Sequence, residues 1–442
     1  MEVGFNYPWF GNRASHWIGP FPQVQDKEHL DPLWIRTIPT NFGRLKRMGV
    51  SVVRVFLLGD CFNYAPGRVR CIEEASELAL RHGYTSPALW SPWRFDQPEY
   101  DLDVPNSKDP DGKPRQFKNH YRQLLICAKN SGLRLIPSIV SFEAFCEPNK
   151  KLYESDPVNV AGGRRDILID AVAQRKWITH VLKVFVDLSK ESDELKKQIY
   201  AIEVMNEPWW NVNVSGAVRK GCIPVPMSMM KTFLSECCKV IEEAGFDSTV
   251  GHRFYNDCLE FPTGTIAQFH YYPKFHSSAL LLLERSAHLS PTMEGISVLS
   301  DIVERTLYPE VRMLPRHPDA LFQIQDAQQK VRSDWSSIPN VTSNMGNTPR
   351  KVKKVIVGEF GSTLMSEVNS DLFSAPPTAS PWPELNGSDR SSDSILHTRL
   401  SHLRSLGYEL ALVWPSLDGD DRDALKMKED RWASLCRFTL GS

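Results

Sequence analysis

Eight stretches rich in apolar residues recur along the chain, and each stops where polar residues, glycine or proline begin. Most of them are nearly continuous in Val, Ile, Leu and Phe, which is typical of strands buried on both faces of a parallel sheet. The fifth stretch has the weakest pattern. The predicted strands are 3–10, 50–60, 133–142, 199–205, 248–254, 266–273, 354–362 and 408–416.

Amphipathic helical patterns lie between several of these strands, and several end at a glycine, a frequent helix stop. The helix after the fifth strand is barely visible. Strand–helix alternation repeated eight times predicts an α/β fold, a (β/α)8 TIM barrel. The predicted helices are 41–49, 117–132, 171–189, 227–245 and 391–407.

The chain has 442 residues, whereas a minimal barrel of this kind needs about 250. The surplus follows strands, and so we expect long loops on the C-terminal face, where barrel active sites are built. No linker divides the sequence, and we therefore expect one catalytic domain over 1–442. The expected loop insertions are about 59–114, 143–170, 273–350 and 363–390.

Composition and charge exclude several classes of function. The formal net charge is -1, which argues against a nucleic-acid partner because such proteins present a basic face. No apolar run reaches the roughly 18 residues of a membrane helix. The start, MEVGFNYPWF, has neither a basic nor an apolar signal region. We expect a cytoplasmic protein, or a secreted one from which a signal peptide has been removed; the oligomeric state is left open.

Cysteine spacing gives no sign of a metal centre. The nine cysteines are scattered and none forms a CxxC pair, so a structural zinc site is not expected. Scattered thiols fit a reducing compartment slightly better than a disulfide framework. We expect neither a metal nor a cofactor.

One strand ends in a way that suggests chemistry. In YAIEVMNEPWW, residues 200–210, an apolar run is followed at once by Glu207 and then by Pro208. Proline has no N–H and cannot extend a sheet ladder. Glu207 therefore lies where a buried strand opens into a loop, which is a costly place for a charge unless the charge is used.

Other polar residues are also expected at the C-terminal ends of strands. The fourth and seventh strands lie across the lumen of a closed barrel, so Glu207 and Glu359 can face each other. The candidate residues at strand ends are Arg54, Asn206, Glu207, His270, Tyr272, Glu359 and Trp414.

Two carboxylates that face each other across a cleft are the machinery of glycoside hydrolysis, in which one acts as an acid and the other is ionised. Arg54 could hold Glu359 ionised by its charge and hydrogen bonds. Glu207, near that negative charge and against Trp209 or Trp210, could have a raised pKa and act as the acid.

The motifs NEP (206–208) and GEFG (358–361) resemble those of clan A of the glycoside hydrolases, retaining barrel enzymes, and most closely family 5, which contains cellulases and mannanases. VRVF on the second strand, FHYYP on the sixth and Trp414 agree with this resemblance. It implies an enzyme that hydrolyses β-linked glycosides or polysaccharides. The implied roles are acid/base for Glu207, nucleophile for Glu359, binding of the sugar 2-hydroxyl for Asn206, hydrogen bonds to the nucleophile for Arg54 and Tyr272, and stacking on the sugar for Trp414.

The end of the third strand departs from the family pattern. Family 5 enzymes usually carry a histidine there, whereas this chain has Ser141, Phe142 and Glu143. The preferred sugar is therefore left open.

Some of these residues could have a structural role instead, and the protein could have another function. Trp414 could be a core residue, Trp209 and Trp210 could pack a loop, and His270 could be structural. A sugar-binding barrel without activity is one alternative function. A metal-dependent barrel hydrolase is another, but it needs clustered ligands, for which His252 and His270 are the histidine candidates.

Overall fold

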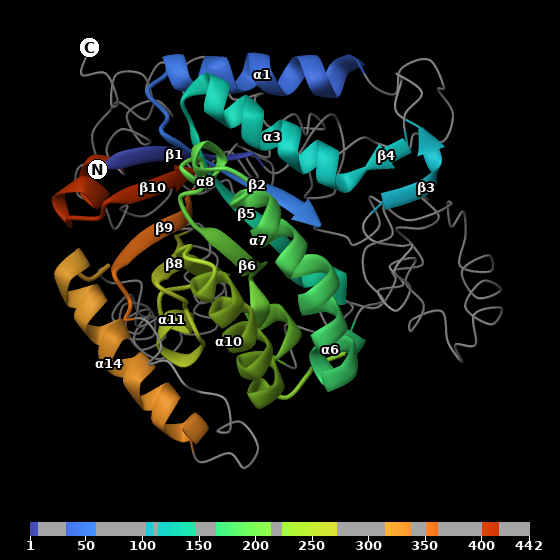
Figure 1. Cartoon of the computed structure of the whole chain (residues 1–442). Helices are drawn as coiled ribbons and strands as arrows, with labels where there is room; N and C mark the ends of the chain where they lie inside the picture. Colours follow the sequence, from blue (N-terminus) through green and yellow to red (C-terminus); the bar gives the residue numbers. More distant parts are fainter. Residues whose placement is uncertain are drawn as a thin grey trace, which may run out of the picture.

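The computed structural model describes residues 1–7, 32–58, 103–108, 114–145, 165–213, 223–271, 314–336, 351–360 and 400–414. Eight parallel strands close into a barrel in the order β1, β2, β5, β6, β7, β8, β9, β10 (Figure 1). Each coincides with one of the predicted apolar stretches, so the predicted (β/α)8 barrel is confirmed. The strands are β1 (Glu2–Tyr7), β2 (Val52–Leu58), β5 (Arg134–Ser141), β6 (Ile202–Asn206), β7 (Ser248–His252), β8 (Ile266–Tyr271), β9 (Lys354–Phe360) and β10 (Leu410–Val413).

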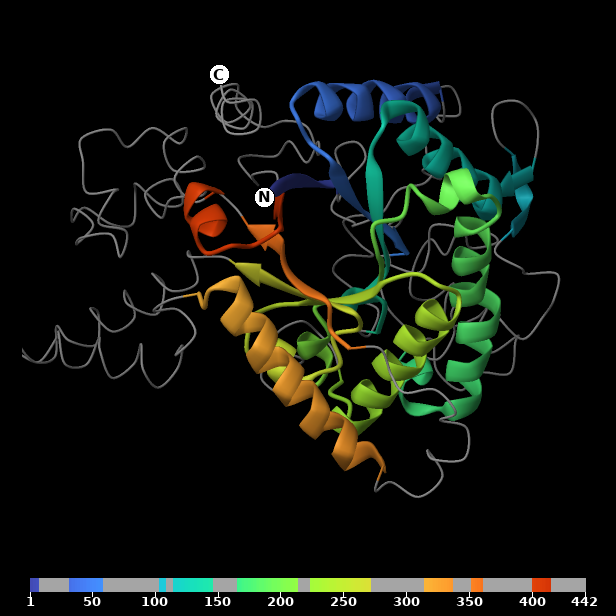
Figure 2. The ribbon, with the colours of Figure 1, turned by 60° about the vertical axis from the view of Figure 1, so that its left-hand side comes forward.

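Helices surround the strands on the outside (Figure 2). Three predicted helices are confirmed, and the predicted 41–49 is the end of a longer helix, α1. In α10 the buried side chains recur every three or four residues, from Met230 to Ile241, and form the stripe that packs on the barrel. The helices are α1 (Pro32–Arg47), α3 (Phe117–Ser131), α6 (Ala171–Trp177), which continues through a π-turn (Ile178–Leu182) into α7 (Lys183–Ser189), α10 (Met227–Glu243) and α14 (His317–Ser336). Of the predicted helix 391–407, residues 400–405 are helical and 391–399 lie outside the described residues.

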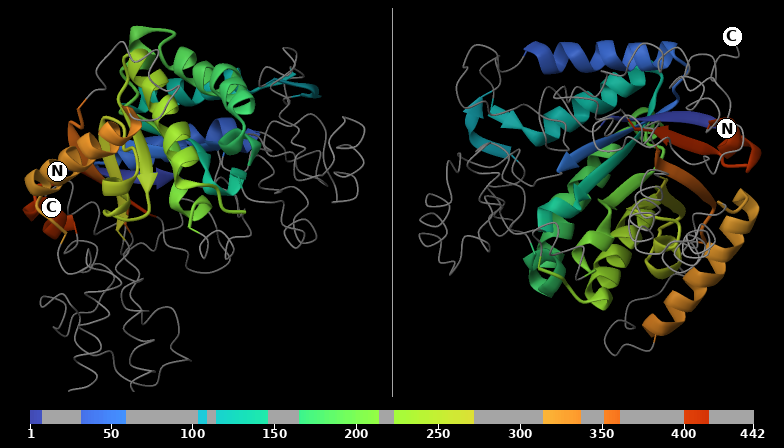
Figure 3. Two further views of the ribbon diagram at one scale, coloured as in Figure 1. Left: turned by 90° about the horizontal axis from the view of Figure 1, so that it is seen from below. Right: turned by 180° about the vertical axis from the view of Figure 1, so that it is seen from behind.

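The expected loop at 273–350 is wrong for residues 317–336, which form α14, a helix of 20 residues. Figure 3 shows α14 along the outside of the barrel next to β9, against which it packs. Its inner face carries Ala320, Ile324 and Gln328, while Phe322 is exposed. The apolar periodicity of this helix is weak, because its buried stripe contains a glutamine and its exposed face carries a phenylalanine. The helix could therefore not be recognised from the sequence pattern.

Short elements account for other parts of the expected insertions. The strand β3 (Asp103–Lys108) lies within the segment 59–114, and its antiparallel partner β4 (Pro114–Gln116) begins at the last residue of that segment. The helix that the sequence barely showed after the fifth strand is α11 (Asp257–Glu260), only four residues long. The remaining short elements are η3 (Phe142–Phe145), α5 (Asp166–Ile169), α8 (Asp193–Lys196) and η5 (Pro208–Asn211).

The barrel lumen is filled in layers. The lower layer, at the N-terminal ends of the strands, is wholly apolar and buried. It consists of Val52, Ile136, Ala201, Ile266, Ile356, Leu410 and Leu412. Two positions further along their strands, Arg54, Glu203 and Gln268 form a polar layer that is also buried. Gly358 makes room for this layer, because a Cβ there would lie 2.4 Å from Cγ of Gln268. The polar layer supports the upper end of the barrel, where the candidate site residues lie.

No helix in the described part of the chain is both long enough and apolar enough to cross a membrane. The four cysteines within the described ranges, Cys127, Cys237, Cys238 and Cys258, are free thiols.

Candidate active site

Glu207 adopts an unusual backbone conformation immediately after β6. Its φ is 50° and its ψ is 55°, and no other non-glycine residue in the described ranges has a positive φ. A side chain in this left-handed region costs on the order of 1–3 kcal/mol, a strain that is typical of functional sites. The Glu207 N–H donates to the Gly251 carbonyl at 2.7 Å, and Pro208 then begins η5. The strand β6 therefore ends just before Pro208, as the sequence predicted.

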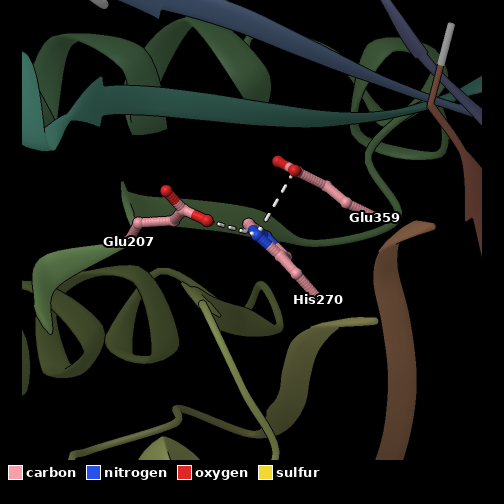
Figure 4. Close-up of side chains that lie close together, drawn as sticks. All are labelled: Glu207, His270 and Glu359. Atoms are coloured by element: carbon pink, nitrogen blue, oxygen red, sulfur yellow. Dashed lines mark hydrogen bonds and ion pairs between the residues drawn. The ribbon is translucent and has the colours of Figure 1, made fainter. Parts of the chain in front are cut away.

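His270 brings the two candidate carboxylates together. Its Nδ1 lies 3.0 Å from Oε1 of Glu207 and 3.3 Å from Oε2 of Glu359. In Figure 4 the two carboxylates approach this nitrogen from different directions. One oxygen of Glu207 lies within 4.8 Å of one of Glu359. The side chain of Glu207 is 17% exposed and that of Glu359 is 5% exposed, so Glu207 has the better access to solvent.

Arg54 lies lower in the barrel than a strand-end position, and that part of the prediction is wrong. It is the third residue of β2 and is fully buried. From there its Nη1 donates a hydrogen bond to Oε1 of Glu359, so the expected partners do meet. Burial alone would lower the pKa of Arg54, but the charges of Glu203 and Glu359 outweigh it and the pKa is raised. The guanidinium is therefore a permanent cation beneath Glu359.

Glu203 is the principal partner of Arg54, and the sequence analysis did not single it out. The two carboxylate oxygens of Glu203 each accept a hydrogen bond of 2.6 Å from Arg54, in a bidentate pair. They also accept bonds of 2.7 Å from Ser138 Oγ and Gln268 Nε2. The available signal was a single acid in an otherwise apolar strand, which is unfavourable unless it is paired.

Gly251 makes this ion pair possible. A Cβ at this position would lie 2.9 Å from Arg54 Nη2 and 2.9 Å from Glu203 Oε1. A side chain would displace the charges that must stay paired in a buried site.

The amide of Asn206 is fixed by two polar neighbours. Its Oδ1 accepts a 2.8 Å hydrogen bond from Arg54 Nη2, and its Nδ2 lies 3.4 Å from Ser141 Oγ. These contacts orient the amide with its NH2 group beside the end of β5. Ser141, where the family resemblance would place a histidine, is thus part of the site.

The tryptophans lie around this centre in different ways. Trp210 Nε1 donates to Oε2 of Glu207 at 2.8 Å, so it is the indole that contacts the candidate acid. Trp209 packs edge-on against Trp210, with ring centroids 5.3 Å apart. Trp414 is half-buried, and its ring meets Phe56 edge-on at 5.9 Å. Tyr272 lies outside the described residues, so its expected bond to the nucleophile stays a prediction.

His252 is a structural residue. It is fully buried, and its Nε2 lies 3.1 Å from the Pro262 carbonyl oxygen. Burial lowers its pKa to about 3, so the ring is neutral. Within the described ranges, the one group of three side chains placed to hold a metal ion is Glu207, His270 and Glu359.

No family model matches the sequence, and no curated protein matches it. Among solved structures, the chain is similar to a β-1,4-mannanase from Cryptopygus antarcticus, with 16% identity and a TM-score of 0.35 over 57% of each chain, so the match spans little more than half of that enzyme. A β-1,4-mannanase from the sea hare Aplysia kurodai has 12% identity and a TM-score of 0.48 over 99% of this chain and 91% of its own. An endo-β-1,4-mannanase from Thermotoga petrophila has 12% identity and a TM-score of 0.46 over 99% and 76%.

Proposed function

We propose that the protein is a retaining glycoside hydrolase that cleaves β-linked glycosides or polysaccharides, with Glu359 as nucleophile and Glu207 as acid/base. The separation of the two carboxylates carries the proposal. Their nearest oxygens are no more than 4.8 Å apart. Retaining enzymes place the two carboxyl groups about 5–5.5 Å apart, whereas inverting enzymes leave about 6.5–9.5 Å for a water molecule.

The environments of the two carboxylates support these roles. Glu359 is the more buried and accepts a hydrogen bond from Arg54, a permanent cation. Glu207 is more exposed and lies on a turn, where it can exchange a proton with a leaving group or with water. Two carboxyls in different environments are the arrangement in which acid and nucleophile are separated.

The reaction would proceed by two displacements. An oxygen of Glu359 forms a bond to the anomeric carbon while the glycosidic bond breaks, and Glu207 gives its proton to the departing oxygen. A water molecule then attacks the glycosyl–enzyme ester, Glu207 takes the proton of this water, and Glu359 leaves as a carboxylate. The Nδ1–H of His270 can donate to either carboxylate, since both lie within 3.3 Å.

Two further residues would contact the sugar. The amide of Asn206 is held at the upper end of the barrel, its Oδ1 by Arg54 and its NH2 group by Ser141, and from there the NH2 group could bind the 2-hydroxyl. The ring of Trp414, half-buried beside Phe56, would offer an apolar face to a pyranose. We therefore propose that a substrate of the kind that glucanases or mannanases cleave binds above these side chains.

The stereochemistry of the product tests this proposal. We expect NMR spectra taken in the first minutes of hydrolysis of an aryl β-glycoside to show the β-anomer, which later mutarotates. A first-formed α-anomer would mean that water attacks directly, and Glu359 would not be a nucleophile.

A metal-dependent hydrolase is the second candidate, because the same three side chains could ligate a divalent cation. Separations of 3.0 and 3.3 Å around His270 Nδ1 are near those between ligands of a zinc ion bound at about 2.0–2.1 Å. We expect activity to survive dialysis against EDTA. Loss of activity that added zinc or manganese restores would favour this candidate.

An inactive sugar-binding barrel would instead bind oligosaccharides without releasing product.

A further inference from the structure

We propose that Arg253 is a positioning residue that fixes the Trp209–Trp210 turn, and through Trp210 sets the orientation of the Glu207 carboxylate. This inference depends on the proposed role of Glu207 as acid/base. Arg253 directly follows β7, which ends at His252, two residues before the predicted end of that strand. It therefore lies on the loop that faces η5.

The turn that carries Glu207 requires support. Glu207 is held in a left-handed conformation, and η5 has only four residues. Short 3₁₀ segments of this kind have poorer hydrogen-bond geometry than an α-helix. The conformation of the acid therefore depends on what packs against the turn.

Two rings hold the two oxygens of the Glu207 carboxylate. His270 Nδ1 contacts Oε1 at 3.0 Å, and Trp210 Nε1 donates to Oε2 at 2.8 Å. His270 belongs to β8, a buried strand, whereas Trp210 is half-buried and belongs to the turn itself. The Trp210 bond can orient the carboxylate only if the indole is fixed in place.

Arg253 and Phe142 confine the pair of tryptophans. The guanidinium carbon of Arg253 lies 3.4 Å from the ring centroid of Trp209 and 5.2 Å from that of Trp210. Phe142 of η3 contacts Trp210, with centroids 6.2 Å apart. The planar guanidinium stacks on an indole face better than an ammonium group does. Trp210 therefore has partners from two other loops of the C-terminal face, besides its own.

Arg253 is itself anchored from its own loop. Its guanidinium also lies 4.1 Å from the ring centroid of Phe254, and its Nε lies 3.8 Å from Oδ2 of Asp257. The same Asp257 oxygen accepts a 3.2 Å hydrogen bond from the Phe254 N–H. With 17% of its side chain exposed, Arg253 is positioned by these contacts and not by solvent. The chain of contacts runs from α11 through Arg253 and the two indoles to Glu207.

Arg253→Met tests this chain of contacts, because methionine keeps an unbranched apolar side chain but removes the planar cation. A misdirected Glu207 should impair proton donation, which matters most for poor leaving groups. We expect kcat/KM to fall about tenfold for an alkyl β-glycoside or an unactivated oligosaccharide, and less than about twofold for a 2,4-dinitrophenyl β-glycoside. Arg253→Lys should recover part of the loss. The matched control is Arg122→Met, which removes an arginine that pairs with Glu191 on the helical surface and should change neither value.

A double-mutant cycle identifies the route. Trp210→Phe removes the indole N–H, so Arg253→Met should add little further loss on the poor substrate in the Trp210→Phe background. Equal losses on both substrates, or independent losses that add in full, would overturn the positioning role. A wild-type enzyme without activity on any glycoside would overturn the proposed function, and this inference with it. Melting temperatures identify a variant that fails to fold; in that case Arg253→Lys and Trp210→Phe carry the same comparison.

Discussion

At the residue scale, Glu203 determines how much of the positive charge of Arg54 reaches the site. Arg54 gives two hydrogen bonds to Glu203 and one to Glu359, so its single charge is shared between them. Glu207 is a third carboxylate nearby. Glu207, the most exposed of the three, has the best access to a leaving group or to water.

Glu203→Ala should destabilise the fold strongly. It leaves the buried guanidinium of Arg54 without its main partner, and breaking a buried pair in this way costs about 3–5 kcal/mol. Urea unfolding followed by circular dichroism measures the change in the free energy of unfolding. Glu191→Ala, which breaks an exposed pair with Arg122, should cost about 0–1 kcal/mol. Similar small losses for both variants would contradict the role of Glu203.

Trp414→Ala tests the proposed floor of the sugar site. An aromatic face contributes roughly 0.5–1.5 kcal/mol beyond the area it buries. Positive charge that develops on a flattening sugar ring strengthens this contact in the transition state. We expect kcat to fall and KM to rise, with a nearly unchanged melting temperature, and Trp414→Phe to recover part of the loss. A collapse in melting temperature with normal turnover of the remaining folded enzyme would identify Trp414 as a core residue.

At the element scale, Asp257, the first residue of α11, binds a proton more tightly in the folded protein than in the unfolded chain. Burial raises the pKa of Asp257 from 3.8 to about 7. Between these values the folded protein holds a proton that the unfolded chain has released. The protonated Asp257 therefore contributes fully to stability below about pH 4, and this contribution is lost as the pH rises through about 7.

Asp257→Asn should remove this pH dependence, since asparagine does not ionise and can still accept the bond from the Phe254 N–H. Relative to wild type, the free energy of unfolding of the variant should improve by roughly 2–4 kcal/mol between pH 4 and pH 8. Denaturant unfolding at several pH values gives this difference. Two curves that run parallel across the range would show that Asp257 titrates alike in the folded and unfolded protein.

The elements also show where sequence patterns succeed and where they fail. Strands such as 354–360 were predictable because burial on both faces demands a continuous apolar run. The helix α14 was missed because its inner stripe includes Gln328, whose Nε2 bonds the carbonyls of Cys258 and Phe261 instead of packing as an apolar group. Glu203 and Arg253 were missed because the partners that tie them to the site, Arg54 for the one and the two tryptophans for the other, lie far away in the sequence. Only the closed barrel brings those partners within contact.

At the scale of the whole molecule, the barrel separates stability from chemistry along its axis. An apolar layer closes the lower lumen, a buried ion pair fills the middle, and the strained Glu207 lies at the upper end with Glu359 and His270. Residues 4 and 358 are glycines where the layers are tightest. Rigid strands therefore hold Glu359 and His270, whereas Glu207 is held by a turn and its neighbours.

Covalent trapping tests the central claim most directly. A 2-deoxy-2-fluoro β-glycoside with a good leaving group slows the second displacement, so the glycosyl–enzyme ester should accumulate. We predict inactivation with one fluoroglycosyl group per chain, and mass spectrometry of a proteolytic digest should place it on Glu359. Glu359→Gln should take up no label. Labelling of another carboxylate, or turnover of the reagent without any adduct, would contradict the assignment of Glu359 as the nucleophile.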